Sequence, residues 1–232
     1  MRKSLLSAAV LLTLALSAGP QVPDSTKESG SGRFDGSFFS CSHERNSEEF
    51  SSRTLRTGVL SSRSGNRAYA VVAATAKGER TCENTTSLFV ARSHSPFQTA
   101  YKRSASGTQD GNGIHLIGWS PDGEKLLAVA TDWAYGSDAA LGKIAVIYDT
   151  ALGKSHEFPV FPQLVKFFNE KCGLDFSVQG WSSNHSFIVK GIQKAPIDET
   201  QETRCNLKPR VFTFDTATGI LAPRSKHKTI SN

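Results

Sequence analysis

Residues 118–154 read GWSPDGEKLLAVATDWAYGSDAALGKIAVIYDTALGK and combine two turn signals with two apolar runs. The first turn, at residues 120–123, has proline where a turn requires φ near about −65° and glycine where it requires positive φ. The apolar run 126–130 follows this turn, and the run 144–148 leads into a second turn at 149–153. This order predicts two linked β-hairpins.

The same pattern occurs once before this segment and once after it. The spacing from Trp119 to Trp181 is 62 residues, and the spacing from Asp149 to Asp215 is 66 residues. We therefore expect three repeats, at about residues 54–104, 114–160 and 175–225, because a long and nearly constant period is typical of a repeat architecture. Strands such as residues 145–148, which are apolar at successive positions, are expected to be covered on both faces.

The sequences GWSPDGEKLLAVA (118–130) and IAVIYDTALGK (144–154) resemble the TolB-type, WD-like β-propeller repeat, most closely over residues 117–154. The resemblance implies a mostly β fold of three four-stranded antiparallel units like propeller blades. In such families the motif residues shape turns and fill the blade core, so the resemblance implies a binding scaffold and assigns no active-site residue.

Three units are fewer than the four to eight blades of most propellers. Three arrangements stay open: an open arc, inclusion of the segment 34–40 as a further strand, or a homodimer that completes a six-unit ring. Residues 162–172 predict a short helix that covers a sheet with Leu164, Val165 and Phe168, because these side chains share one helical face. A helix that binds a partner is the alternative.

The ends of the chain are expected to lie outside the β-repeat domain, which we place at residues 34–225. Residues 1–18 have the basic start, apolar run and small residues of a signal peptide, whose removal leaves no transmembrane span. Residues 19–33 predict a disordered spacer, residues 104–113 a linker, and residues 226–232 a flexible tail. The net charge of +6 comes from scattered Lys and Arg, so nucleic acid is not an expected partner.

The four cysteines of an exported chain predict two disulfides and a periplasmic or secreted location. In an up-and-down four-stranded unit, the start of the first strand and the loop between strands two and three lie at the same end. Cys41 and Cys172 precede first strands, while Cys82 and Cys205 fall in such loops, so we predict the pairs Cys41–Cys82 and Cys172–Cys205. A zinc site is the rival interpretation; without a CxxC pair we expect no metal and no cofactor.

The loops between strands two and three are expected to be long, at residues 75–86, 131–142 and 193–209. Because insertions at one repeat position gather on one face, this face is the expected binding face. Asp132, Trp133, Tyr135 and Asp138 are the candidate ligand-binding residues, since aromatic and carboxylate side chains together suit sugars or peptides. The alternative is that Trp133 and Tyr135 cover the edge of the sheet.

Enzyme motifs do not occur in the chain: it has neither a GxSxG elbow nor an HExxH sequence. We therefore expect an exported, non-enzymatic binding or scaffold protein of the cell envelope that contacts a protein or envelope polymer through its loop face. Two alternatives remain. One is a small exported hydrolase or lyase that uses carboxylates such as Asp132 and Asp138, and the other is a purely structural envelope component.

Overall fold

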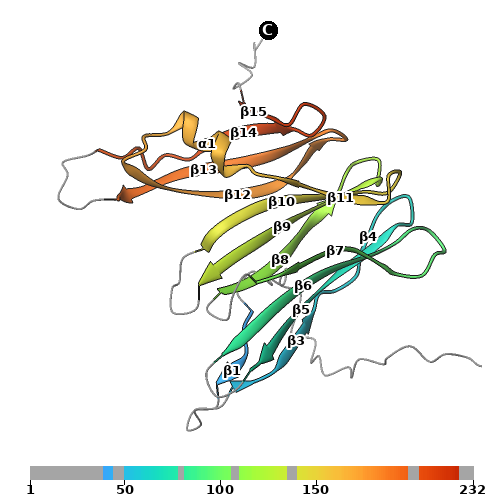
Figure 1. Cartoon of the computed structure of the whole chain (residues 1–232). Helices are drawn as coiled ribbons and strands as arrows, with labels where there is room; N and C mark the ends of the chain where they lie inside the picture. The colour runs from blue at the N-terminus through green and yellow to red at the C-terminus, as the bar shows by residue number, and fades with distance from the viewer. Residues whose placement is uncertain are drawn as a thin grey trace, which may run out of the picture. The chain divides into compact units, whose positions relative to one another are not determined.

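The computed structural model describes residues 39–43, 50–77, 81–105, 110–134, 140–197 and 204–224. The chain divides into a unit of residues 1–30 and a unit of residues 31–232, and every described residue belongs to the second unit. The described part is mostly β, with three antiparallel sheets of four or five strands and one short helix (Figure 1). Within it, no helix is long and apolar enough to cross a membrane.

Each sheet is built from strands that follow one another along the chain. The first sheet contains β3 (Arg53–Arg56), β4 (Leu60–Ser61), β5 (Arg67–Ala76), β6 (Cys82–Ala91) and β7 (Gln98–Ser104). The second contains β8 (Asp110–Trp119), β9 (Lys125–Ala134), β10 (Ala140–Asp149) and β11 (Lys154–Phe158). The third contains β12 (Cys172–Ser183), β13 (Ser186–Pro196), β14 (Arg210–Asp215) and β15 (Ile220–Pro223). A two-stranded ribbon, β1 (Ser42–His43) and β2 (Phe50–Ser51), precedes them.

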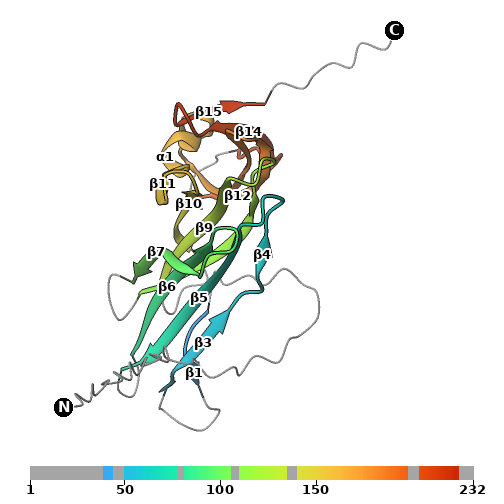
Figure 2. The same cartoon turned by 90° about the vertical axis from the view of Figure 1, so that its right-hand side faces the viewer.

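The second sheet lies between the first and the third sheets (Figure 2). It is apolar on both faces, and a separate hydrophobic core lies on each face. Leu126 and Ala128 pack with Ala70 and Leu88 of the first sheet. Leu127, Val129, Ala145 and Ile147 pack with aromatic side chains of the third sheet. The prediction that the strands of this segment are covered on both faces is confirmed.

Two tryptophans connect neighbouring sheets in the same way. The Trp119 indole N–H donates to the carbonyl of Leu60 at 3.1 Å, and the Trp181 indole N–H donates to the carbonyl of Gly118 at 2.9 Å. The two acceptors are 58 residues apart and the two donors 62 residues apart. The repeats therefore agree in side-chain contacts as well as in strand order.

Both disulfides have the predicted partners. Cys41 is bonded to Cys82 and Cys172 to Cys205, and the structure contains no free cysteine among its described residues. Cys82 lies at the first position of β6 rather than within a loop. The Cys41–Cys82 pair still forms because β5 and β6 continue in register to Ala76 and Cys82, which brings this end of the hairpin beside Cys41.

The predicted helix at 162–172 is wrong in length. The structure has α1 (Phe161–Leu164) followed by the 3₁₀ turn η2 (Val165–Phe167), and β12 begins at Cys172. The backbone is extended at Phe168, whose ring packs 5.8 Å from that of Phe212. Leu164 and Phe168 cover the third sheet at Gly191 as expected, whereas Val165 is exposed.

The predicted loops and the linker are also shorter than expected. Strand β9 extends to Ala134, β10 begins at Ala140, and β8 begins at Asp110 inside the expected linker. The polar and glycine residues that suggested irregular structure lie in strands, where Asn84, Thr86 and Asn112 are buried and hydrogen-bonded between sheets. Hydrogen bonding to a neighbouring sheet satisfies these side chains, so their polarity does not end the strands.

The first strand of the first repeat is also different from the sequence prediction. In place of one continuous strand, the structure has β3 and β4, both of which pair with β5. Between them the Thr57 side chain accepts from the backbone N–H of Ala70 at 2.9 Å, which replaces a strand contact. Of the expected segment 34–40, only Phe39 and Ser40 are described, and neither is in a strand. The signal peptide, the spacer and the tail at 226–232 lie outside the described residues.

Candidate functional site

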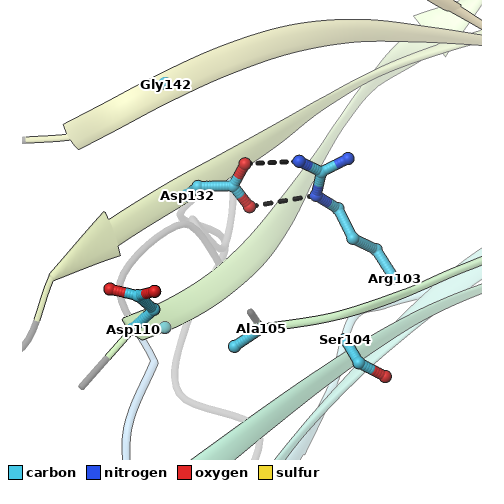
Figure 3. Close-up of a pocket in the computed structure, with 7 residues that line it drawn as sticks. Arg103, Ser104, Ala105, Asp110, Asp132 and Gly142 are labelled. Atoms are coloured by element: carbon cyan, nitrogen blue, oxygen red, sulfur yellow. Dashed lines mark hydrogen bonds and ion pairs between the residues drawn. The ribbon is translucent and has the colours of Figure 1, made fainter. Parts of the chain in front are cut away.

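A cavity of about 250 Å³ opens between the first and second sheets, at the end where β5 joins β6 and β9 joins β10. Its lining comes from the end of β7, the start of β8, and the adjoining parts of β9 and β10 (Figure 3). The lining residues are Arg103, Ser104, Ala105, Asp110, Gly111, Asp132 and Gly142. One candidate residue from the sequence, Asp132, is therefore at the cavity.

Arg103 and Asp132 form a two-pronged ion pair across this cavity. Arg103 Nε donates to Asp132 Oδ1 at 3.0 Å, and Arg103 Nη2 donates to Asp132 Oδ2 at 2.5 Å. Figure 3 shows the guanidinium facing the Asp132 carboxylate, while Asp110 lies apart from this pair. Both Asp132 oxygens are engaged, and this geometry is among the stronger arrangements for an exposed ion pair.

A second carboxylate continues the network on the far side of Arg103. Glu157 of β11 accepts from Arg103 Nη1 at 3.1 Å and from the Tyr101 hydroxyl at 2.7 Å, both through Oε1. Burial, and then the hydrogen bond to Glu157, raise the pKa of Tyr101 far above its ordinary value. The hydrogen bond to Asp132 likewise raises the pKa of Arg103. Tyr101 and Arg103 therefore remain protonated hydrogen-bond donors throughout the physiological range.

Below the ion pair, a buried polar layer holds the two sheets in register. Asn112 of β8 donates to the Arg103 carbonyl at 3.1 Å and accepts from the Thr86 hydroxyl at 2.9 Å. Asn84 of β6 donates to the Asn112 carbonyl at 3.2 Å. Asn84, Thr86 and Asn112 are almost completely buried. The backbone that carries Arg103 is thus fixed by a network of satisfied hydrogen bonds.

The structure separates the candidate residues that the sequence grouped together. Successive residues of a strand point to opposite faces, so Asp132 faces the first sheet and Trp133 faces away from it. Trp133 is 5% exposed and its ring lies over Gly111, where an added Cβ would be 2.2 Å from the ring. Gly111, which belongs to the segment 104–113 that was expected to be a linker, is needed here for close packing. Tyr135 and Asp138 lie outside the described residues.

The polar groups described around the Arg103–Asp132 pair are already bonded to one another. Asp132 is already bonded to the Arg103 guanidinium, and the raised pKa values of Tyr101 and Arg103 keep these two groups protonated near neutral pH. In the part of the chain that the structure describes, no group of three or more His, Cys, Asp or Glu could hold a metal ion. Within the cavity, the arrangement suits a polar ligand held by hydrogen bonds.

No motif in the sequence indicates a role for Arg103, Tyr101 or Glu157. A signal for two of them was present, because Tyr101 and Arg103 are two residues apart at the end of the first expected repeat and so lie on one face of a strand. That face is the inner one, where a charged residue requires a partner. The partner itself could not be predicted, since Asp132 belongs to another sheet. Comparisons of the chain with protein-family models, curated proteins and solved structures found no match.

Proposed function

We propose that this chain is an exported, non-enzymatic binding or scaffold protein of the cell envelope, built from propeller-like blades. The ligand would be a protein or an envelope polymer, contacted at the end of the sheets that carries the cavity. The observation on which this rests is the Arg103–Asp132 pair, a fixed and fully engaged charge pair at the cavity. Such a pair supports ligand positioning and leaves Asp132 little capacity for acid or base catalysis.

The blade interpretation is supported by contacts that recur between successive sheets. The indoles of Trp119 and Trp181 bind equivalent carbonyls in the preceding sheet. The turns after β10 and β14 use the same device, because Asp149 accepts from the N–H groups of residues 151 and 152, and Asp215 from those of residues 217 and 218. An open set of three blades leaves room for a partner beside it.

Export is supported by the two disulfides, since such bonds persist in oxidising compartments. A periplasmic or secreted location fits both this redox requirement and the leader-like sequence of residues 1–18. Envelope polymers and envelope proteins would then be the ligands within reach.

Co-sedimentation with isolated envelopes of a Gram-negative bacterium tests the proposal, with purified peptidoglycan and outer-membrane vesicles measured separately. We expect saturable binding that an A105W variant reduces, because a tryptophan at Ala105 would fill the cavity. An S177W variant, which adds the same side chain to the exposed Ser177 of the third sheet, is the matched control and should bind normally. Failure of the wild-type protein to sediment would contradict the proposal, as would release of soluble fragments that a D132N variant abolishes.

A further inference from the structure

The outer face of the first sheet, on the side away from the second sheet, carries a row of aromatic and arginine side chains. Buried residues of β5 and β6 alternate with partly exposed ones, so Tyr69 and Phe89 lie on the outer face. Phe97 joins them from the turn before β7. Arg56 and Arg67 complete a set that we call the aromatic row: Arg56, Tyr69, Phe89, Phe97 and Arg67.

The rings of this row are packed against one another and against the two guanidinium groups. Tyr69 stacks on Phe89 with centroids 4.9 Å apart and meets the edge of Phe97 at 4.8 Å. The Arg56 guanidinium lies 4.1 Å from the Tyr69 centroid, and that of Arg67 lies 5.1 Å from the Phe97 centroid. Both arginines can still offer N–H donors at the edge of the guanidinium plane.

The strand order determines which parts of the Tyr69 ring remain accessible. Arg56 comes from β3 and Phe89 from β6, and these strands flank β5 on opposite sides. The two faces of the Tyr69 ring are therefore covered, and its edge remains for contact. Nucleobases require an open ring face for stacking, whereas aliphatic and carboxylate groups of a protein can pack against ring edges, which carry partial positive charge.

The first sheet is also the basic part of the molecule. Residues 50–105 contain nine Lys and Arg against two Asp and Glu, a net charge of +7, while the whole chain has +6. Residues 110–224 contain eleven Lys and Arg against thirteen Asp and Glu, a net charge of −2. Arg56 of the aromatic row is exposed, as is Lys102, which pairs with Ser87 two residues before Phe89. A partner for this face must therefore supply negative charge.

A second copy of this chain does not meet that requirement. Two first sheets related by a twofold axis would bring the positive charges of Arg56, Arg67 and Lys102 against the same residues of the other copy. The outer face of the third sheet presents Lys190, which is exposed between Ser177 and Val211 of the adjacent strands. Neither arrangement gives charge complementarity, so a different, acidic chain is required.

We propose that the outer face of the first sheet is the docking surface for an acidic protein. Carboxylates of that partner would bind Arg56 and Arg67, and its apolar side chains would pack on the edges of Tyr69, Phe89 and Phe97. Tyr and Arg are enriched among the residues that dominate protein–protein binding energy, and a flat sheet face provides the surrounding contact area. This face is opposite the Arg103 cavity, so the docking surface does not depend on the proposed function.

Selection of a phage-displayed library of random 12-residue peptides on the full-length mature protein tests this proposal. The enriched peptide is then synthesised and titrated calorimetrically against the wild-type protein, R56E, K102E and K190E, each verified as folded by thermal unfolding. We expect enriched peptides to combine acidic with apolar residues. The Kd should rise at least about tenfold for R56E, should rise for K102E, should stay within about twofold for K190E, and should increase with salt.

Several results would overturn the proposal. These are an absence of enriched peptides, enrichment of peptides that lack acidic residues, or equal affinity of the wild-type protein and both first-sheet variants. Binding of a single-stranded oligonucleotide or of heparin that R56E abolishes, without peptide binding, would assign the face to a polyanion instead. A dimer in light scattering that R56E dissociates would assign it to a second copy. If R56E fails to fold, the affinity of K102E for the enriched peptide decides the test in its place.

Discussion

The central strands of the first and third sheets place their aromatic side chains on opposite faces. In the third sheet Phe176, Phe187, Phe212 and Phe214 point inward and are almost completely buried. In the first sheet the inner face is built from small residues such as Ala68 and Ala70, while Tyr69 and Phe89 point outward. In both sheets, buried and more exposed residues alternate along the central strands. The inner faces of the two sheets therefore differ in the size of their apolar side chains and not in the pattern of alternation.

This difference indicates a division of roles. The third sheet buries large rings against the second sheet and against α1, and ring burial provides much of the stabilisation of a small core. The first sheet is joined to the second by small apolar residues, the Asn112 network and the Arg103–Asp132 pair. Its aromatic residues therefore add less to folding and are available to a partner.

Truncation of one ring in each sheet gives the largest expected contrast. A F187A variant should lose about 3–5 kcal/mol of unfolding free energy, because a buried ring is removed and a cavity remains. A F89A variant should lose only about 1 kcal/mol, mainly from the contact with Tyr69, because Phe89 is partly exposed. Urea denaturation monitored by circular dichroism measures both values.

F212A serves as a second probe of the third sheet, since Phe212 is equally buried and contacts Phe167 and Phe168. A loss for F89A as large as that for F187A would mean that the outer face of the first sheet is part of the folding core. The distinction between a stabilising sheet and a binding sheet would then be wrong.

The sequence was sufficient to predict a mostly β fold of three antiparallel units, the turns at 120–123 and 149–153, and the disulfide partners. These features depend on local signals, such as the proline and glycine of residues 120–123, and on a spacing that repeats within the chain. The extent of the strands was predicted less well, because Asn112 and its neighbours have the composition of a loop. Their hydrogen-bond partners Thr86 and Arg103 come from a different sheet, which single-strand patterns do not reveal.

The candidate site could be predicted only in part for the same reason. Asp132 lies at the cavity, but its environment is determined by Arg103, whose position depends on how two sheets pack. Trp133, in contrast, was expected at the site but does not belong to it. An aromatic residue next to a carboxylate in the sequence suggests a ligand site, but Asp132 and Trp133 are successive residues of β9 and point to different faces of the sheet. Tyr69 lies on the outer face of its sheet and Phe187 on the inner face of its sheet. This difference can be read from the sequence only once the inner face of each sheet is known.

Removal of the tryptophan hydrogen bonds compares the two junctions between sheets. W119F and W181F each delete an indole N–H that binds a carbonyl of the preceding sheet. Each should lower the unfolding free energy by about 1–2 kcal/mol, the usual cost of leaving a partly buried carbonyl without its donor. Equal losses in urea denaturation would support equivalent blades. A loss at only one junction would show that the first and third sheets are attached differently.

The smallest effect concerns the turns that follow the third strand of each repeat. In the third sheet Asp215 accepts from the backbone N–H and hydroxyl of Thr218 and from the N–H of Ala217, and these bonds lower the pKa of Asp215. The corresponding turn of the first sheet begins at Arg92, and His94 there has φ of 62°. It contains no carboxylate between Arg92 and Phe97.

The third-sheet turn should therefore be the more acid-sensitive of the two. A lowered pKa in the folded state means that Asp215 stabilises the protein above the unfolded-state pKa of about 3.9, and that this stabilisation is lost as pH falls through the folded-state pKa. We expect wild-type protein to lose more stability than D215N between pH 6 and pH 2.5, by less than about 1 kcal/mol because the turn is exposed and screened. Urea midpoints at the two pH values measure this difference, and H94G, which relaxes the first-sheet turn without altering a carboxylate, is the control. If D215N and the wild-type protein lost equal stability, the hydrogen bonds of Asp215 would not make the third-sheet turn more acid-sensitive than the first-sheet turn. The two sheets would then differ only in the face on which their aromatic side chains lie.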